Sequence, residues 1–157
     1  MCIVVRRATT ADAQLVSSLN ADVQALHATA MPWLFKQPGP NTFPPKDAEV
    51  LLAKPDHLIF IAEITGEPAG YAVAEIVRRA ETPFHHPFAM VHLHHISVRP
   101  DHRRQGVGNT LLAAVRASGK EHGITLLSAD VWTFNERARA FFRRNGLSQY
   151  VERVWDR

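Results

Sequence analysis

Short apolar runs of strand type alternate along the chain with segments in which apolar residues recur every three or four positions. The strand-type runs are rich in β-branched and aromatic residues and are bounded by glycine, proline or charged residues, which predicts strands. They cover residues 2–7, 58–64, 69–77, 90–98, 124–132 and 147–155. The turn residues Gly66, Glu67 and Pro68 join the second and third runs, so these two are expected to form a hairpin.

Helical periodicity predicts helices between these strands. The first is expected to begin near Thr9 and Asp12, to end before Pro32, and to bury one apolar stripe formed by Leu15, Leu19, Val23 and Leu26. The others are expected at 47–54, 106–122 and 135–145, the last capped by Asn135 and stopped by Gly146. With no repeat and no internal linker, the pattern predicts one α/β domain over residues 1–157 with a mixed sheet.

Composition narrows the class of protein. Apolar residues make up 46% of the 157 residues and charged residues 21%, which is typical of a globular domain and excludes a disordered or collagen-like chain. Cys2 is the single cysteine, so an internal disulfide framework and a cysteine-rich zinc site are excluded. No apolar run is long enough to span a bilayer and the first residues lack a secretory signal, which predicts a cytoplasmic protein with no membrane partner.

The net charge of the chain is ordinary for a globular protein, whereas its histidines and prolines are unevenly distributed. The formal net charge of +3 is small and most basic residues have an acidic neighbour, so a solvated surface is favoured over a nucleic-acid partner. Histidine is unevenly placed, since six of the nine histidines lie between residues 85 and 102. Five of the ten prolines lie between residues 31 and 45, around Trp33, Leu34 and Phe35, which predicts a rigid loop that is either a lid over a site or a stiff connection.

The strongest local chemistry lies in residues 98–109, where a strand leads through a loop into a helix. Gly106 and Gly108 open that helix, so the backbone N–H groups there can approach a ligand closely, and the helix start adds partial positive charge. Arg103 and Arg104 precede the glycines, as a phosphate-bearing ligand would require. The residues match neither the Walker loop nor the dinucleotide-binding fingerprint, because Asn109 and Leu111 stand where those motifs need Lys and Gly.

Two segments resemble the GNAT superfamily of N-acetyltransferases. The residues Arg103-x-x-Gly106-x-Gly108 are similar to its Arg/Gln-x-x-Gly-x-Gly/Ala signature, and the strand 94–100 before them is similar to the fourth strand of the family. A second motif of the family resembles a set of residues near the end of the chain in type and spacing: Asn135, Ala138, Phe141, Phe142 and Gly146. The resemblance implies an α/β (α+β) fold, with a mixed, mostly antiparallel, twisted sheet of six to seven strands, about four flanking helices and a gap between strands 4 and 5.

The resemblance also implies acetyl-coenzyme A as co-substrate. Strand residues 96–98 would pair with the pantetheine arm, the N–H groups of residues 104–109 would hold the pyrophosphate, and a backbone N–H near Val98 would polarise the acetyl carbonyl. Asn135 would lie beside the pantetheine or thioester, and Arg144 would reach the adenosine phosphates. The implied cofactor residues are Ile96, Ser97, Val98, Arg103, Arg104, Gln105, Gly106, Val107, Gly108, Asn109, Asn135, Phe142 and Arg144.

Catalysis of amine acetylation requires removal of a proton from the ammonium. His94 is the candidate base, because it stands where several family members have a glutamate and because imidazole has an ordinary pKa of about 6.5. The usual tyrosine acid of the family is replaced by Phe142, which has no proton to donate. The acceptor amine, a small molecule or peptide, is expected to contact Trp33, Phe35 and His95.

Two other interpretations remain open. The same fold without catalysis would be an acyl-coenzyme A binding or sensing module. Alternatively, the histidines could hold a metal: alternation along a strand predicts that His92 and His94 share a face while His95 points the other way, so His85 or His86 would have to complete such a site. The favoured interpretation has no metal. The family is often dimeric, so a homodimer is expected, with residues 149–155 as an exchanged strand.

Overall fold

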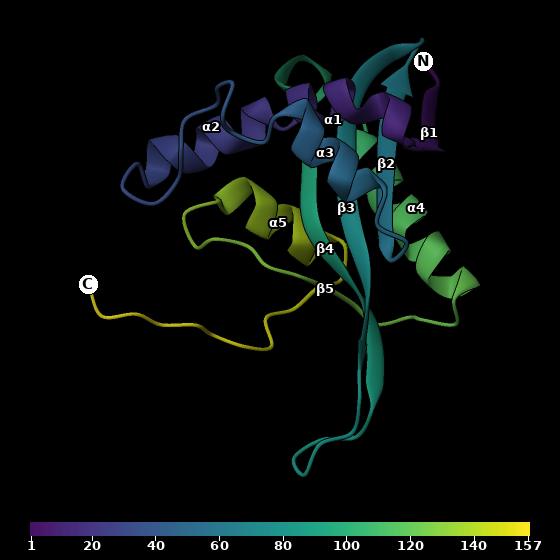
Figure 1. The fold of residues 1–157 in the computed structure, drawn as a ribbon, viewed down its shortest axis with the longest axis vertical. Coiled ribbons are helices and arrows are strands. Elements are labelled where there is room, and N and C mark those ends of the chain that lie inside the picture. The colour runs from purple at the N-terminus through teal and green to yellow at the C-terminus, as the bar shows by residue number, and fades with distance from the viewer.

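The computed structural model describes all 157 residues and contains one five-stranded sheet (Figure 1). Its strands follow one another in sequence order: β1 (Ile3–Arg7), β2 (His57–Ile64), β3 (Glu67–Arg79), β4 (Phe88–Val98) and β5 (Leu127–Ala129). Strands β1 to β4 are antiparallel to their neighbours, and β5 runs parallel to β4. The predicted mixed, mostly antiparallel sheet and its hairpin at Gly66 are confirmed.

The prediction of six to seven strands is wrong. Residues 147–155, expected to be a closing strand, form no strand, and residues 148–157 take part in no backbone hydrogen bond. A strand requires a neighbouring edge to accept and donate its ladder hydrogen bonds, and this tail runs away from the sheet (Figure 1). The strand expected at 124–132 is shortened to β5, because its pairing with β4 covers only Leu127–Ala129.

The helices lie close to their predicted positions. They are α1 (Ala13–Leu19), α2 (Ala21–Ala30), α3 (Pro45–Leu52), α4 (Val107–Glu121) and α5 (Glu136–Arg144), with short 3-10 turns at Thr10–Asp12 (η1) and Pro100–His102 (η2). The predicted first helix is divided at the buried Asn20 into α1 and α2. None of the helices combines the length and apolar character needed to cross a membrane.

Each face of the sheet has its own apolar core. On one face, Ala72 and Ala74 of β3 pack with the buried stripe of α4, which includes Leu111 and Val115. On the other face, Tyr71 and Val73 of β3 pack with α1 and α3. The alternation of side chains along β3 therefore assigns odd-numbered residues from 71 to 75 to the face covered by α1 and α3.

Strand β4 has two irregularities. Its parallel pairing with β5 covers only Val91 to Leu93, so the β5-facing edge of β4 has no strand beside it from His94 onward. In its pairing with β3, Leu93 lies opposite Ala74 and His95 lies opposite Val73, which leaves His94 as an extra residue in a β-bulge. The expected gap between the fourth and fifth strands is thus present, and the bulge lies where the gap begins.

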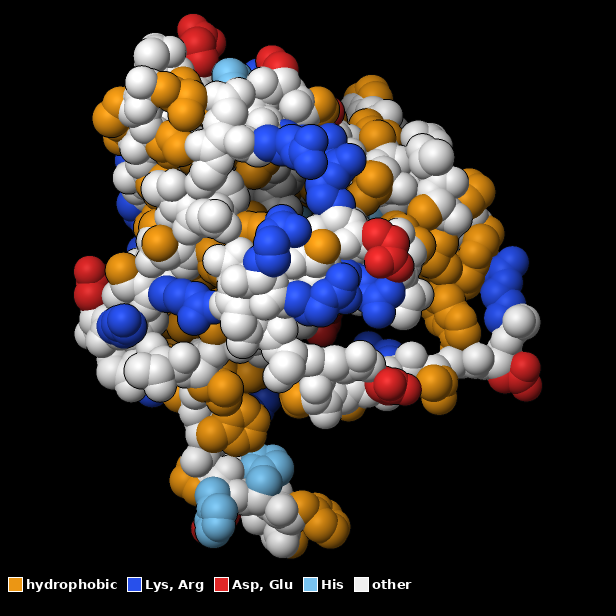
Figure 2. Space-filling view, turned by 180° about the vertical axis from the view of Figure 1, so that it is seen from behind, with side chains coloured by type: hydrophobic (Ala, Val, Ile, Leu, Met, Phe, Trp, Pro, Cys, Tyr) orange, Lys and Arg blue, Asp and Glu red, His pale blue; other side chains and the backbone are white.

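The hairpin formed by β3 and β4 extends beyond the rest of the molecule (Figures 1 and 2). Figure 2 shows histidine and hydrophobic side chains at its tip, where the connecting residues include His85, His86 and Phe84. Phe84 is 95% exposed. The turn is held by Thr82, whose N–H donates to the His85 carbonyl and whose Oγ1 accepts from the Phe84 and His85 N–H groups.

Candidate functional site

The loop from β4 to α4 has a backbone shape that only a few residues tolerate. Arg104 has φ of 62° and Gly106 has φ of 87°, so two residues of the loop adopt the left-handed conformation before α4 begins at Val107. Glycine takes this conformation without a steric penalty, whereas arginine does so at a cost. Both left-handed residues lie directly before the first turn of α4.

The backbone N–H groups from Arg104 to Asn109 donate to no acceptor within the chain; the first residue of this segment whose N–H is bonded is Thr110, to the Gly106 carbonyl. The unpaired donors include the first turn of a helix, where the peptide dipoles add partial positive charge. Such an arrangement binds anions and suits a phosphate or pyrophosphate. The unpaired N–H groups that the predicted anion-binding loop requires are therefore present, and the binding of an anion there stays a prediction.

Arginine side chains surround this loop in different ways. Arg103 folds back so that its Nε donates to the Val98 carbonyl at 3.1 Å. Desolvation, followed by the nearby charge of Arg137, lowers the pKa of Arg103 from its ordinary value. Arg103 thus braces the end of β4, while Arg104 and Arg144 are exposed and free to meet a ligand. Figure 2 shows basic side chains gathered across the middle of one face of the molecule.

Residues on α4 and α5 hold the helix start in place. An added Cβ at Gly108 would lie 3.1 Å from the Phe141 ring, so glycine there permits close packing of the two helices. Asn109 accepts a hydrogen bond from Asn145 at 3.1 Å. Asn135 caps α5, as predicted, by accepting from the Ala138 N–H at 3.1 Å. Phe142, predicted to contact the cofactor, lies in the apolar core with 8% of its surface exposed.

The side chain of His94 is bonded to β3. Its Nε2 lies 2.7 Å from Glu75 Oε2, and the His94 side chain is 39% exposed. The hydrogen bond from His94, followed in size by opposing desolvation, gives a net lowering of the Glu75 pKa, so this carboxylate is ionised at neutral pH. A neutral His94 must donate Nε2–H to that carboxylate, which leaves the lone pair on Nδ1.

Two more histidines flank this pair. His57 lies opposite Glu75 in the β2–β3 register, its ring is parallel to that of His94 at 6.0 Å, and its Nδ1 is buried without a hydrogen-bond partner. His92 donates to or accepts from Ser128 Oγ at 2.8 Å, and its ring centre lies 4.8 Å from that of His94. Burial is the largest cause lowering the pKa of both His57 and His92.

One set of metal-type ligand atoms is found here, on His57, Glu75 and His94, all within 4.8 Å of one another. It is not the set suggested by the sequence, which required His85 or His86; those two lie in the hairpin loop. The 2.7 Å separation of His94 Nε2 from Glu75 Oε2 is that of a hydrogen bond. Two ligands of one tetrahedral zinc ion would stand about 3.3 Å apart.

The side chain of His95 lies on the same face of the sheet as those of His92 and His94. The prediction that His95 points away from His92 and His94 is wrong, because the bulge at His94 inserts one residue and reverses the alternation after it. The His95 Nδ1 lies 3.1 Å from the Tyr71 hydroxyl, which in turn accepts from Asn20 Nδ2 at 2.9 Å. Burial lowers the pKa of His95 to about 4 and raises the pKa of Tyr71.

Trp33 and Phe35, predicted to line the acceptor entrance, belong to a cluster of aromatic rings. Phe35 packs edge-on against Trp132 at 5.2 Å and against His27 of α2 at 5.1 Å. Trp33 lies 5.6 Å from Trp155 and stacks beneath the Arg157 guanidinium at 3.5 Å. The proline-rich loop is therefore tied to the segment after β5 and to the C-terminal tail.

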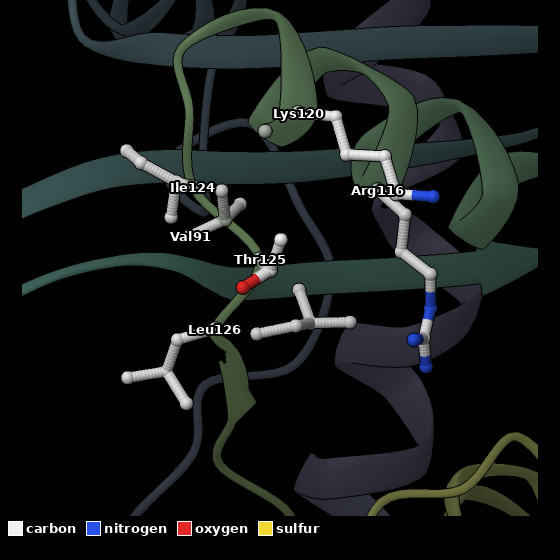
Figure 3. Close-up of a pocket in the computed structure, with 8 residues that line it drawn as sticks. Val91, Arg116, Lys120, Ile124, Thr125 and Leu126 are labelled. Atoms are coloured by element: carbon white, nitrogen blue, oxygen red, sulfur yellow. The ribbon is translucent and has the colours of Figure 1, made fainter.

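Two small pockets are found away from His94. One, of about 80 Å³, lies between the C-terminal half of α4 and the segment entering β5, and Figure 3 shows Arg116 and Lys120 at its rim with Ile124 and Leu126 opposite. It is smaller than the roughly 300 Å³ or more of ligand sites. The other, of about 190 Å³, is lined by Ser18, Leu19, Asp22 and Arg99, at the junction of α1 and α2.

Three residues around the histidines were missed by sequence reasoning: Asn20, His57 and Glu75. The predicted hairpin of 58–64 with 69–77 places residue 57 beside β3, but its pairing with Glu75 depends on a register shift between Ala62 and Glu63 that the residue pattern does not specify. The sequence carried no signal for the hydrogen bond from Asn20 to Tyr71, because it joins residues 51 positions apart.

The sequence of the chain is similar to those of known acetyltransferases. The sequence profile of the "Acetyltransferase (GNAT) family" matches residues 23–147. A curated relative, an uncharacterised N-acetyltransferase from Lactobacillus delbrueckii subsp. lactis, is 27% identical over 104 residues. That alignment covers 66% of this chain and 59% of the relative, so the match spans little more than half of the relative's length.

Solved structures share the fold. The BH1408 protein of Bacillus halodurans, solved as a tetramutant, is 21% identical with a TM-score of 0.92, covering 98% of this chain and 99% of that chain. The aminoglycoside N-acetyltransferase AAC(6′)-Iy, solved in complex with CoA, is 21% identical with a TM-score of 0.78, covering 99% of this chain and 94% of that chain. At these identities the likeness establishes the fold.

Proposed function

Because the chain belongs to the GNAT family of acetyltransferases, we propose that it transfers the acetyl group of acetyl-coenzyme A to a primary amine of a small molecule or peptide. The amine attacks the thioester directly while both substrates are bound. The ammonium loses one proton before attack, the C–N bond forms and the C–S bond breaks. The nitrogen then loses its second proton as the tetrahedral intermediate collapses, and the departing thiolate gains a proton through water, so that one proton is released in total. Crystals of one structural relative contain CoA, which is consistent with this donor.

The observation that carries the proposal is the row of unpaired N–H groups from Arg104 to Asn109, placed at the end of a strand with an open edge. The pyrophosphate of the cofactor would be held by these groups and by Arg104 and Arg144. The pantetheine arm would lie along Ile96, Ser97 and Val98, where β4 has no neighbour on the β5 side. A backbone N–H near Val98 would then polarise the acetyl carbonyl.

Asn135 and Phe142 have narrower parts in this proposal. The Asn135 Oδ1 is occupied by capping α5, so its Nδ2 is the group available to the pantetheine or thioester. Phe142 supports the cofactor site from the core side of α5. Gln105 is braced by a hydrogen bond from its Nε2 to the Asp101 carbonyl at 3.2 Å, so its contribution is its backbone N–H.

His94 is proposed as the group that removes the proton from the ammonium. Its Nε2–H is held by Glu75, which leaves Nδ1 to accept the proton. Glu75 is a positioning residue: its charge stabilises the imidazolium that forms and fixes the tautomer of the ring. The acceptor would approach past Trp33 and Phe35, on the side of the sheet that carries α1 and α2.

Binding of the cofactor can be tested with a matched pair of glycine variants. Gly106→Trp would crowd the anion-binding loop, whereas Gly123→Trp makes the same change at another left-handed glycine beyond the C-terminal end of α4. Neither added Cβ meets backbone. Calorimetry should detect acetyl-coenzyme A binding to the wild type and to Gly123→Trp, and none to Gly106→Trp. Equal affinity of all three proteins would refute the assignment of the loop.

A second function is supported by one observation. Phe142 replaces the usual proton donor and is buried, so the same fold could bind acyl-coenzyme A without efficient turnover. A screen of primary amines that follows thiol release separates the two functions. Release above the rate without amine supports the transferase, and binding without release in any member of the screen supports the sensor.

We also propose that the chain acts as a single GNAT domain over residues 1–157, in the cytoplasm, without a bound metal, and as a homodimer. The tail supports the dimer. It carries two pairs of apolar residues separated by two charged residues, and all four apolar side chains are largely exposed: Tyr150, Val151, Val154 and Trp155. A partner subunit that offers a strand edge would cover them.

A further inference from the structure

We propose that His95 is a neutral hydrogen-bond donor that selects acceptor amines carrying an oxygen atom close to the amino group. This inference rests on the proposed function for its substrate, but its structural basis is independent of turnover. It assigns to two consecutive histidines opposite tasks: His94 accepts a proton and His95 donates a hydrogen bond.

The tautomer of His95 follows from a chain of three side chains. Asn20 Nδ2 can only donate, so the Tyr71 oxygen accepts that hydrogen bond at 2.9 Å. The Tyr71 proton is then directed at His95 Nδ1, 3.1 Å away, which must supply a lone pair. A neutral imidazole with its lone pair on Nδ1 carries its proton on Nε2.

The environment keeps the His95 ring neutral. The largest cause is desolvation, and the positive charges of His94 on β4 and His27 on α2, when protonated, oppose a further charge. Tyr71 is buried and its pKa is raised, so it offers no negative charge in compensation. Phe43, from the loop before α3, covers the ring edge-on at 6.2 Å. No carboxylate lies close enough to raise the pKa of His95 against these effects.

The Nε2–H of His95 is available to a ligand. The Nε2 atom of His95 makes no hydrogen bond within the chain. If it were buried it would be a buried polar atom without a partner, but the one such side-chain atom in the molecule is His57 Nδ1. The Nε2 atom of His95 therefore reaches the molecular surface. It lies on the face of the sheet that carries α1 and α3, beside the proposed base on the preceding residue.

The chemistry of the ligand follows from this arrangement. A neutral donor beside a proton acceptor suits a molecule that offers a hydrogen-bond-accepting oxygen near an amine. Amines with a hydroxyl or carbonyl group on the neighbouring carbon have this pattern, and simple alkyl amines lack it. One well-placed hydrogen bond should favour the former by about tenfold in kcat/KM.

The tautomer can be tested by long-range proton–nitrogen NMR of the whole protein at pH 7. We expect His95 to carry its proton on Nε2 in the wild type, and Tyr71→Phe to give a mixture of tautomers. His27 and His122 are internal references, because their Nδ1 atoms face the carbonyls of Val23 and Ser118 and must carry the proton. A wild-type His95 that is cationic or protonated on Nδ1 would overturn the proposal.

Selectivity provides the second test, with ethanolamine and ethylamine as a matched pair of probes. We expect the wild type to prefer ethanolamine about tenfold. The preference should disappear in His95→Phe, which has no donor, and be partly restored in His95→Gln, which can accept from Tyr71 and still donate. A wild type without this preference, or a preference unchanged in His95→Phe, contradicts the role of His95. Absence of thiol release with every amine of the screen contradicts the proposed function instead, and the NMR result then tests the tautomer of His95 by itself.

Discussion

His94 and His95 are consecutive in β4, yet their rings bind partners on the same face of β3: Glu75 for His94 and Tyr71 for His95. In a regular strand, neighbouring side chains point to opposite faces. The bulge at His94 removes that constraint and brings two imidazoles with different partners beside each other. The difference between the partners, a carboxylate and a phenol, is what gives the two rings different chemistry.

Replacement of Glu75 by Gln should slow turnover without weakening cofactor binding. The amide can still accept from His94 Nε2–H, but it has no charge to stabilise the imidazolium. We expect kcat to fall about tenfold, equivalent to about 1.4 kcal/mol of barrier, with an unchanged KM for acetyl-coenzyme A.

The matched control is Glu67→Gln, at the exposed first residue of β3. Steady-state kinetics should give wild-type kcat for this variant. Because the His94 hydrogen bond lowers the pKa of Glu75 from its ordinary value of 4.5, its carboxylate is ionised at any pH above that value. The difference between wild type and Glu75→Gln should therefore persist down to about pH 5. Equal rates for wild type and Glu75→Gln would remove Glu75 from the mechanism.

Gly70 in β3 should tolerate no larger residue. A Cβ there would lie 2.5 Å from the Ser97 carbonyl oxygen and 3.2 Å from Val98 Cα, so backbone in β4 would have to move. We expect Gly70→Ala to lower the free energy of unfolding by about 3 kcal/mol, measured by urea denaturation. Gly39→Ala, in a loop where nothing lies within 4 Å of the added atom, should change it by less than about 0.5 kcal/mol.

Acid should weaken the anchor between β1 and η1. Arg6 donates two hydrogen bonds to the Asp12 carboxylate, at 2.8 and 3.0 Å. Hydrogen bonding from Arg6 is the largest of the causes that lower the pKa of Asp12 to about 2. A lowered folded-state pKa means that this stabilisation is complete above the ordinary value of 3.8 and is lost as the pH falls toward 2. Arg6 is 38% exposed, so solvent screening reduces the contribution to about 1 kcal/mol.

Asp12→Asn should accordingly lower the free energy of unfolding by about 1 kcal/mol at pH 7 and by nothing measurable near pH 2. Urea denaturation at pH 7, 4 and 2 checks this dependence. Glu136→Gln, which breaks the exposed pair with Arg139, is the control and should have little effect at any pH. A pH-independent loss in Asp12→Asn would assign the effect to the N-terminal capping contacts of Asp12 with Thr9 instead.

Removal of residues 148–157 should dissociate the proposed dimer. The tail takes part in no backbone hydrogen bond within its own chain, so its deletion should leave the sheet intact. Sedimentation velocity should show a dimer for the full chain and a monomer for the shortened one, with similar circular dichroism. A shortened chain that remains dimeric would place the interface elsewhere.

The sequence carried enough local information to predict most elements of this fold. The hairpin at Gly66, the cap at Asn135 and the glycine at the start of α4 are specified by residues close together in the chain, and each was correctly placed. The closing strand was wrong because strand formation at residues 147–155 depends on a partner edge that periodicity does not report. The prediction for the face of His95 was wrong for a related reason. A bulge is a property of two paired strands, and the residues of β4 alone do not specify it.

The candidate site divides in the same way. The row of unpaired N–H groups before and within the first turn of α4 is a local feature, so the glycines at 106 and 108 were sufficient to predict it. The bonds from His94 to Glu75 and from His95 to Tyr71 span 19 and 24 residues and exist only after β3 and β4 pair in one register.

The aromatic cluster around Trp33 provides the molecule with its own optical probe. The chain has three tryptophans, and Trp155 lies 5.6 Å from Trp33 and 5.8 Å from Trp132, so their emission comes from one place. That place joins the proline-rich loop, the segment after β5 and the tail. Entry of an acceptor past Phe35, or release of the tail to a partner subunit, will therefore change the intrinsic fluorescence of the unlabelled protein.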